Sequence, residues 1–257
     1  MSLQFDHIVY GPIHSRRLGS SLGVNLLPKH GKICTFDCIY CECGWNRDHR
    51  GDTVLPTKEE VFAALENGLR SCKTNNLSID TITFSGNGEP TLHPAFAEII
   101  DFTLALRDEI FPSAKVSVLS NATQLARPGV QEALAKVDNP ILKIDSADEA
   151  LARTLDNPVG TYSVASVMEQ MAWFNGNFVL QTMFLKGVVD GRDIDCSDRL
   201  FADKWVEMAL KLHPREIMMY TLDRVPPLAT LEKVSVEKMK EIAAPLIAAG
   251  IEVIVKG

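Results

Sequence analysis

The sequence lacks any stretch able to cross a membrane. Its longest uncharged stretch, residues 170–185, contains Asn175, Asn177 and Gln181, whereas a spanning helix needs about 20 mostly apolar residues. The segment from Met1 to Asp6 has no basic region followed by an apolar one, so no signal peptide is expected. These absences predict a cytoplasmic protein without a membrane partner.

Glycine and proline are too scarce for a linker or a low-complexity protein, with 16 Gly and 13 Pro among 257 residues. A content of 46% hydrophobic and 23% charged residues is typical of a globular chain. Only six cysteines are present, and four of them lie within residues 34–43. Since the cytoplasm disfavours structural disulfides, this group indicates a metal site. The isolated Cys72 and Cys196 are expected to be small buried side chains.

Basic residues are fewer than acidic ones, with 26 Lys or Arg against 33 Asp or Glu, so the net charge is −7. The excess of acids argues against a broad non-specific nucleic-acid surface. Residues 1–50 nevertheless contain six Lys or Arg and only four acids. Five side chains of this region could bind an anionic substrate or RNA phosphates, or could equally form a solvated basic surface. They are Arg16, Arg17, Arg47, His49 and Arg50.

What the sequence does contain is an alternation of strand and helix patterns. Short apolar runs predict strands at 22–27, 79–84, 116–119, 141–144, 178–185, 216–221 and 251–255. A capping box at Thr57–Glu60 begins a helix. Other helices are expected at 94–110, 128–136, 163–174, 198–212 and 236–249, the last ending at Gly250.

Repeated strand–helix units with short connections predict a parallel α/β sheet, either a partial barrel or an open doubly wound sheet. Polar clusters follow five of the strands, at 85–89, 120–123, 145–146, 186–187 and 223–224. In a barrel these strand ends converge on one mouth, which favours the barrel. The whole of 1–257 is expected to be one domain, with 10–30 forming an N-terminal segment and first strand, 31–50 a metal-binding loop, and 51–257 the remaining units.

The cysteine group reads Cys34-Thr-Phe-Asp-Cys38-Ile-Tyr-Cys41-Glu-Cys43. Three thiolates at this C-x3-C-x2-C spacing can bind three irons of a cubane, leaving the fourth iron open for catalysis. The alternative is a zinc site that also uses Cys43. Zinc sites commonly combine ligand pairs from two separate places, and no second pair is present here.

Cys34, Cys38 and Cys41, with Tyr40 before the last cysteine, resemble the motif of radical S-adenosylmethionine (SAM) enzymes. Residues 83–91, Thr-Phe-Ser-Gly-Asn-Gly-Glu-Pro-Thr, are similar to the glycine-rich acidic turn of that family. The resemblance runs from Tyr10 to about Val255. It implies a partial (β/α)6 TIM-type barrel, a 4Fe-4S cluster on the three cysteines, and SAM on the open iron. The cleaved SAM would supply a 5′-deoxyadenosyl radical, which abstracts hydrogen from the substrate.

The resemblance also implies contacts for SAM. Gly88 and Glu89 would receive its amino group, and Ser120 and Asn121 would meet its carboxylate or ribose. Asp145 and Ser146 would meet the ribose or methionine end. By strand position, the candidates on the adenine side are Tyr40, Thr182 and Tyr220. No catalytic residue acting on the substrate is assigned.

Residues 10–19, 155–158 and 220–227 resemble a bacterial branch near the tRNA wyosine-synthesis enzymes, which suggests RNA base modification. The archaeal wyosine enzymes carry additional cysteines before the motif, whereas none precedes Cys34 here. The alternatives are a glycyl-radical-enzyme activase, a peptide modifier, or a non-enzyme that binds zinc or carries electrons through an iron–sulfur cluster. The substrate could therefore be RNA, a peptide or a small molecule. A flavodoxin- or ferredoxin-type electron donor and a monomeric state are expected.

Overall fold

A computed structural model describes residues 5–15, 17–49 and 51–257. Its main sheet has eight strands in the order β1-β2-β3-β4-β5-β6-β9-β11. Their bounds are β1 (Val9–Ser15), β2 (Gly19–Val24), β3 (Thr81–Phe84), β4 (Lys115–Ser120), β5 (Asn139–Lys143), β6 (Val179–Met183), β9 (Glu216–Tyr220) and β11 (Glu252–Lys256). Strand β1 is antiparallel to β2, and every later pair is parallel.

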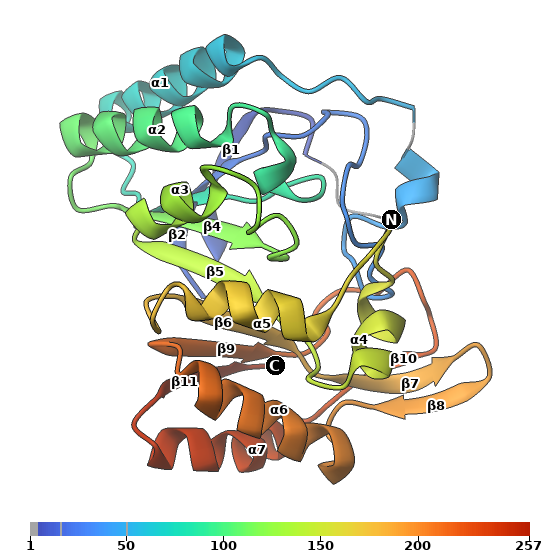
Figure 1. Cartoon of the computed structure of the whole chain (residues 1–257). Helices are drawn as coiled ribbons and strands as arrows, with labels where there is room; N and C mark the ends of the chain where they lie inside the picture. The colour runs from blue at the N-terminus through green and yellow to red at the C-terminus, as the bar shows by residue number, and fades with distance from the viewer. Residues whose placement is uncertain (1–4, 16, 50) are drawn as a thin grey trace.

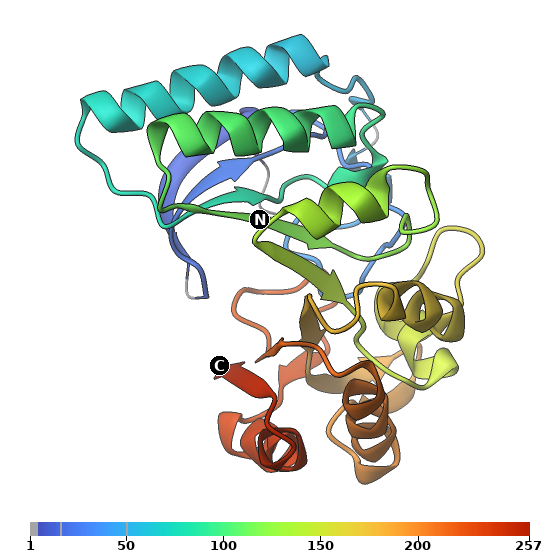
Figure 2. The ribbon, with the colours of Figure 1, turned by 60° about the vertical axis from the view of Figure 1, so that its left-hand side comes forward.

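The helices cover the outer, convex side of this curled sheet (Figures 1 and 2). They are α1 (Lys58–Thr74), α2 (Phe96–Ile110), α3 (Val130–Lys136), α4 (Glu149–Asp156), α5 (Val164–Ala172), α6 (Arg199–Leu212) and α7 (Val236–Ala248), with short 3-10 turns η1 (Asn46–His49) and η2 (Pro90–Leu92). Within the described ranges, the edge strands β1 and β11 do not pair with each other. The sheet is therefore a half-barrel, which confirms the predicted partial barrel over the open sheet.

Seven predicted strands match the seven parallel strands of the sheet, each within a few residues. The predicted capping box is also confirmed, since the Thr57 side chain accepts a hydrogen bond from the Glu60 backbone and the Glu60 side chain accepts one from Thr57. Gly250 has a φ of +86° directly after the last helix, as a helix-ending glycine requires.

The structure corrects the expectation for the fifth predicted strand, 178–185. This run divides between β6 and β7 (Leu185–Val189), and β7 belongs to a small antiparallel sheet with β8 (Arg192–Asp195) and β10 (Leu231–Lys233). The placement of 186–187 at the barrel mouth was therefore wrong. Lys186 and Gly187 lie inside β7, where they pair with β10 on one side and β8 on the other.

Apolar side chains pack on both sides of the sheet. A large core lies between the sheet and the helices, and its fully buried members include Phe84 and Trp205. A smaller cluster of Ile141, Val179 and Met218 is separate from that core, and Leu18 packs against it. In the described part of the chain, no helix is both long enough and apolar enough to cross a membrane.

Candidate active site

The cysteine-bearing loop is attached to the glycine-rich turn by backbone hydrogen bonds. Ile33 pairs with Gly88 as a parallel bridge, in which the Ile33 amide donates to Asn87 O at 3.1 Å and the Glu89 amide donates to Ile33 O at 3.0 Å. Gly88 has a φ of +132°, and a Cβ there would lie 1.8 Å from Ile33 O. Only glycine permits this approach, so the two motifs found in the sequence form one backbone unit.

The other side of the loop pairs with the C-terminal end of α4 and the residues that follow it. The Asp37 amide donates to Asp156 O at 3.0 Å, the Ile39 amide donates to Leu155 O at 3.0 Å, and the Val159 amide donates to Thr35 O at 2.8 Å. The Leu-Asp-Asn-Pro sequence at 155–158 thus has a structural role next to the cysteines. It fixes the loop that carries Cys34 and Cys38.

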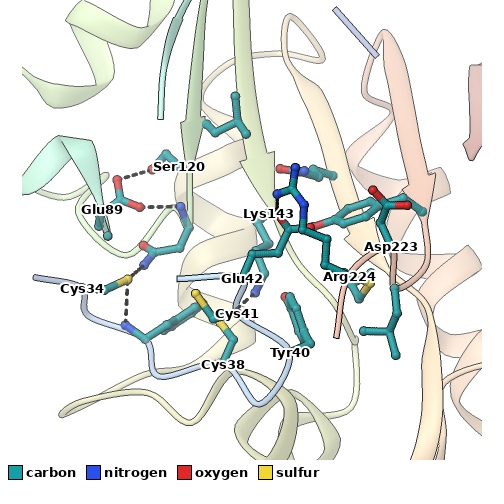
Figure 3. A pocket seen from close by; sticks show the side chains of 18 of the residues that line it. Cys34, Cys38, Tyr40, Cys41, Glu42, Glu89, Ser120, Lys143, Asp223 and Arg224 are labelled. Atoms are coloured by element: carbon teal, nitrogen blue, oxygen red, sulfur yellow. Dashed lines mark hydrogen bonds and ion pairs between the residues drawn. The ribbon is translucent and has the colours of Figure 1, made fainter. Parts of the chain in front are cut away.

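A cavity of about 270 Å³ opens at the carboxyl ends of the parallel strands. Its walls include the cysteine loop, the glycine-rich turn and the ends of β4, β5 and β9: Cys34, Cys38, Tyr40, Cys41, Gly88, Glu89, Ser120, Asn121, Lys143 and Tyr220. Figure 3 shows the cysteines on one loop, with Glu89 and Ser120 to one side and Lys143 and Arg224 to the other. Most of the residues predicted for the site are therefore brought together.

The three predicted cluster ligands all face this cavity. Asn121 Nδ2 lies 3.6 Å from Cys34 Sγ, and Lys143 Nζ lies 3.9 Å from Cys38 Sγ. Burial raises the pKa of Cys34 to about 12, whereas a hydrogen bond from the Cys43 thiol lowers the pKa of Cys41 to about 6. Within the described ranges, no three His, Cys, Asp or Glu side chains gather around a single ion site. Thiols spread along one cavity wall suit a cubane, because its ligands bind different irons.

Lys32 was not singled out from the sequence, and the structure places it directly behind the loop. Its side chain is 1% exposed and lies 3.6 Å from Asp37, while its ammonium donates to Gly44 O at 2.6 Å. Burial alone would lower the pKa of Lys32, but the thiols of Cys41, Cys34 and Cys38 outweigh it and the pKa is raised. The ammonium thus ties the two ends of the loop together and offsets the negative charge that three thiolates would bring.

The Glu89 carboxylate is buried and organises the end of β4. Its Oε1 accepts from the Thr91 hydroxyl and from Ser120 Oγ at 2.9 Å, and its Oε2 accepts from the Asn121 amide at 2.7 Å. Burial raises the pKa of Glu89 even though these donors act in the opposite direction. Since a carboxylate has about four acceptor positions, Oε2 can accept a further donor from the cavity.

A second polar network lies at the end of β5. Asp145 accepts hydrogen bonds from the Tyr40 hydroxyl and from the Met183 amide, the latter at 3.0 Å. Lys143 forms ion pairs with Asp145 at 2.9 Å and with Asp156. Lys143 and Asp156 were given no role from the sequence. The alternation of a strand carries the signal for Lys143, because it stands two residues before Asp145 and so shares its face.

Four residues of interest do not line the cavity. The Asp145 side chain is fully buried beside Lys143. Thr182 is fully buried on the helix-facing side of β6, where its hydroxyl donates to Ile144 O at 2.7 Å and accepts from the Trp205 indole at 3.1 Å. Ser146 accepts from the Asp148 amide at 3.1 Å. The SAM contacts of Thr182 and Ser146 remain predictions. The Cys43 thiol lies behind the loop, 3.4 Å from Gly86 O.

The basic residues near the N-terminus do not form one patch in the described structure. Arg17 lines the cavity, whereas Arg47 and His49 lie at a separate hollow beside Trp45 and Val225. Arg16 and Arg50 lie outside the described residues. Cys41 borders both hollows, so the loop is the wall between them.

Comparison with known proteins agrees with this geometry. Residues 29–192 match the radical SAM superfamily. The chain belongs to the radical SAM superfamily. A UPF0026 protein of Helicobacter pylori strain J99 is 31% identical over 222 residues, which are 84% of this chain and 67% of that protein.

Several solved structures share the fold of this chain. Streptococcus suis SuiB bound to S-adenosylmethionine has a TM-score of 0.63 at 15% identity, over 88% of this chain and 49% of SuiB. Archaeal TYW1 has a TM-score of 0.52 at 13% identity, over 89% of this chain and 71% of TYW1. The chain therefore spans about half the length of SuiB.

Membership of the radical SAM superfamily fixes the broad chemistry. The protein is a radical SAM enzyme, and its cofactors are a 4Fe-4S cluster and SAM. Such an enzyme requires a reductant. The set of donors in the cavity fits this pair, with three thiols on one wall and carboxylate, hydroxyl and amide groups next to them.

Proposed function

We propose that this enzyme cleaves SAM with Cys34, Cys38 and Cys41 as the cluster ligands, and that the resulting radical abstracts hydrogen from an RNA base. The observation that supports the site is the single cavity shared by the three thiols, the Gly88–Glu89 turn and the end of β4. When bound, the cluster supplies the electron that breaks the carbon–sulfur bond of SAM. A flavodoxin- or ferredoxin-type protein is the proposed source of that electron.

The protein's own residues bind and orient SAM. Glu89 Oε2 is the acceptor for the SAM amino group, because it faces the cavity and keeps an acceptor position after bonding the Asn121 amide. The amide of the Asn121 side chain, 2.9 Å from Thr35 Oγ1, connects the end of β4 to the cysteine loop. Asp145, which accepts a hydrogen bond from the Tyr40 hydroxyl, is the proposed partner of the ribose. Tyr40, which lines the cavity, is the proposed contact on the adenine side.

The proposed RNA substrate rests on the resemblance of residues 10–19 and 220–227 to the wyosine-synthesis branch. Six of these residues line the cavity, namely Arg17 and residues 220–224. The structural likeness to TYW1 concerns the fold and adds no evidence about the substrate. A peptide substrate is the alternative that the test must distinguish.

Deuterium transfer tests both the chemistry and the substrate class. The reconstituted enzyme is incubated anaerobically with reductant, SAM and either deuterated RNA or deuterated peptides, both prepared from cells grown in heavy water. We expect deuterium in 5′-deoxyadenosine with RNA only, measured by mass spectrometry. Deuterium from peptides alone would contradict the RNA proposal, and a complete absence of 5′-deoxyadenosine would contradict the radical chemistry.

A further inference from the structure

Arg17 lies at the tip of the β1–β2 hairpin, inside the half-barrel. Because β1 runs antiparallel to β2, this tip lies at the amino ends of the parallel strands. The next residue, Leu18, packs against Ile141, Val179 and Met218 of β5, β6 and β9. Figure 2 shows the hairpin in blue, extending from the sheet toward the C-terminal part of the chain. The hairpin thus brings Arg17 to the cavity from the side opposite the mouth.

The Arg17 guanidinium is held in place but is not neutralised. Its Cζ lies 4.6 Å from the centre of the Tyr220 ring, and the group lines the cavity. Its NH1 atom is buried and has no hydrogen-bond partner. Among the residues described, no carboxylate forms an ion pair with it. A buried donor without a partner is costly and demands an explanation.

The other cations of the cavity differ from Arg17 in this respect. Lys143 is paired with Asp145 and Asp156, and Arg224 is paired with Glu42. Their charges are already compensated within the protein. Arg17 therefore carries the charge that a ligand would have to compensate.

We infer that Arg17 binds an oxyanion, a phosphate or a carboxylate, of the substrate that enters the cavity beside SAM. The planar guanidinium offers two parallel N–H donors that match either group, and the Tyr220 ring fixes the plane of the fork. The carboxylate of SAM itself is placed at the cluster and the end of β4 by the proposed function. This inference rests on that function, since it assigns Arg17 to the second substrate.

Calorimetric titration of the cluster-loaded, SAM-saturated protein with inorganic phosphate, and separately with acetate, tests the site. We expect one binding event with at least one of the two ions. Loss of a charged hydrogen-bond partner should weaken it about tenfold or more in Arg17→Ala. Arg17→Lys should retain part of the affinity. The matched control is Arg192→Ala, since Arg192 is exposed on β8.

Each outcome has a defined meaning. Binding of phosphate alone identifies a phosphorylated substrate, and binding of acetate alone identifies a carboxylate substrate. If neither ion binds the wild type, or if Arg17→Ala binds the ion as well as the wild type does, the inference is wrong. It is also wrong if Arg17→Ala, with an unchanged unfolding midpoint, loses affinity for SAM, because Arg17 would then belong to the SAM site. The titration needs no reductant, so a failure to cleave SAM would contradict only the proposed function.

Discussion

Gly88 is the residue at which the two sequence motifs become one site. Its positive φ lets the chain turn, and its missing side chain lets the carbonyl of Ile33 approach. Either property alone would favour glycine. Together they explain why the cysteine loop and the acidic turn keep a fixed distance, which a cluster and SAM require when they share one cavity.

Gly88→Ala should therefore reduce the iron content of the reconstituted protein to less than about half, because the new Cβ displaces the loop. Gly160→Ala is the matched control, since Gly160 also has a positive φ, +101°, but has no atom within 4 Å of an added Cβ. Iron and sulfide analysis measures the effect, and far-UV circular dichroism checks the fold. Equal iron contents in the two variants would show that the contact with Ile33 is not required.

Cys43 differs from the three proposed ligands in its position behind the loop. Its thiol donates a hydrogen bond to Gly86 O at 3.4 Å and does not line the cavity. Cys43→Ala should therefore retain about four irons per chain, whereas Cys41→Ala should lose the cluster. Iron analysis and the visible absorption spectrum measure both variants. Loss of iron in Cys43→Ala to the extent seen in Cys41→Ala would make Cys43 a ligand and revive the zinc-type arrangement of four cysteines.

At the scale of the elements, the parallel strands could be predicted because each is a short apolar run bounded by polar residues. The pattern fails for β1, which contains Gly11 and Pro12 and is mostly half-exposed or exposed. It also fails for β7, whose interior residues Lys186 and Gly187 resemble a loop. Helix α4 has only eight residues, too few for a clear helical period.

The site was predictable to the extent that its chemistry is local in the sequence. The cysteine spacing and the glycine-rich turn are contiguous motifs, so they could be found without a structure. Lys32 and Arg17 act through distant partners, Gly44 and Tyr220 respectively. Thr182 was predicted to lie near SAM from its position on a strand, and yet it does not line the cavity. A strand places alternate side chains on opposite faces, and the Thr182 side chain faces Trp205.

Asp138 connects helix α2 to strands β4 and β5 and gives a prediction at this scale. Its Oδ2 accepts from Arg107 and from the Val116 amide, both at 2.8 Å. Burial alone would raise the pKa of Asp138, but these donors outweigh it and lower the pKa below its usual 3.8. The carboxylate therefore stabilises the fold above that pH, and this stabilisation is lost as the pH falls through the lowered pKa.

Asp138→Asn should lower the free energy of unfolding by about 1 kcal/mol at pH 7, given the partial exposure of the pair. The difference from wild type should shrink as the pH falls below about 4. Urea unfolding at several pH values measures this. Asp203→Asn is the control, because its ion pair with Arg199 is largely exposed and should contribute little. A difference that does not depend on pH would contradict the role of the charge.

At the scale of the whole molecule, the half-barrel leaves an open edge between β1 and β11 within the described part of the chain, and the β1–β2 hairpin extends its tip into the interior. The cavity is thus bounded by the cysteine loop at the mouth and, on the opposite side, by Arg17 and by Leu119, which packs against the apolar cluster. Enclosure of this kind keeps water away from a reactive radical. It also leaves room for ligands that an electron carrier would not need.

The most direct test of the central claim is 5′-deoxyadenosine release by the anaerobically reconstituted, dithionite-reduced protein in the presence of SAM. The wild type and Cys43→Ala should both form 5′-deoxyadenosine, even without added substrate, and Cys38→Ala should form none. Liquid chromatography with mass spectrometry measures the product. A reduced wild type that carries a full complement of iron and sulfide but forms no 5′-deoxyadenosine, while passing electrons to other proteins, would contradict the account.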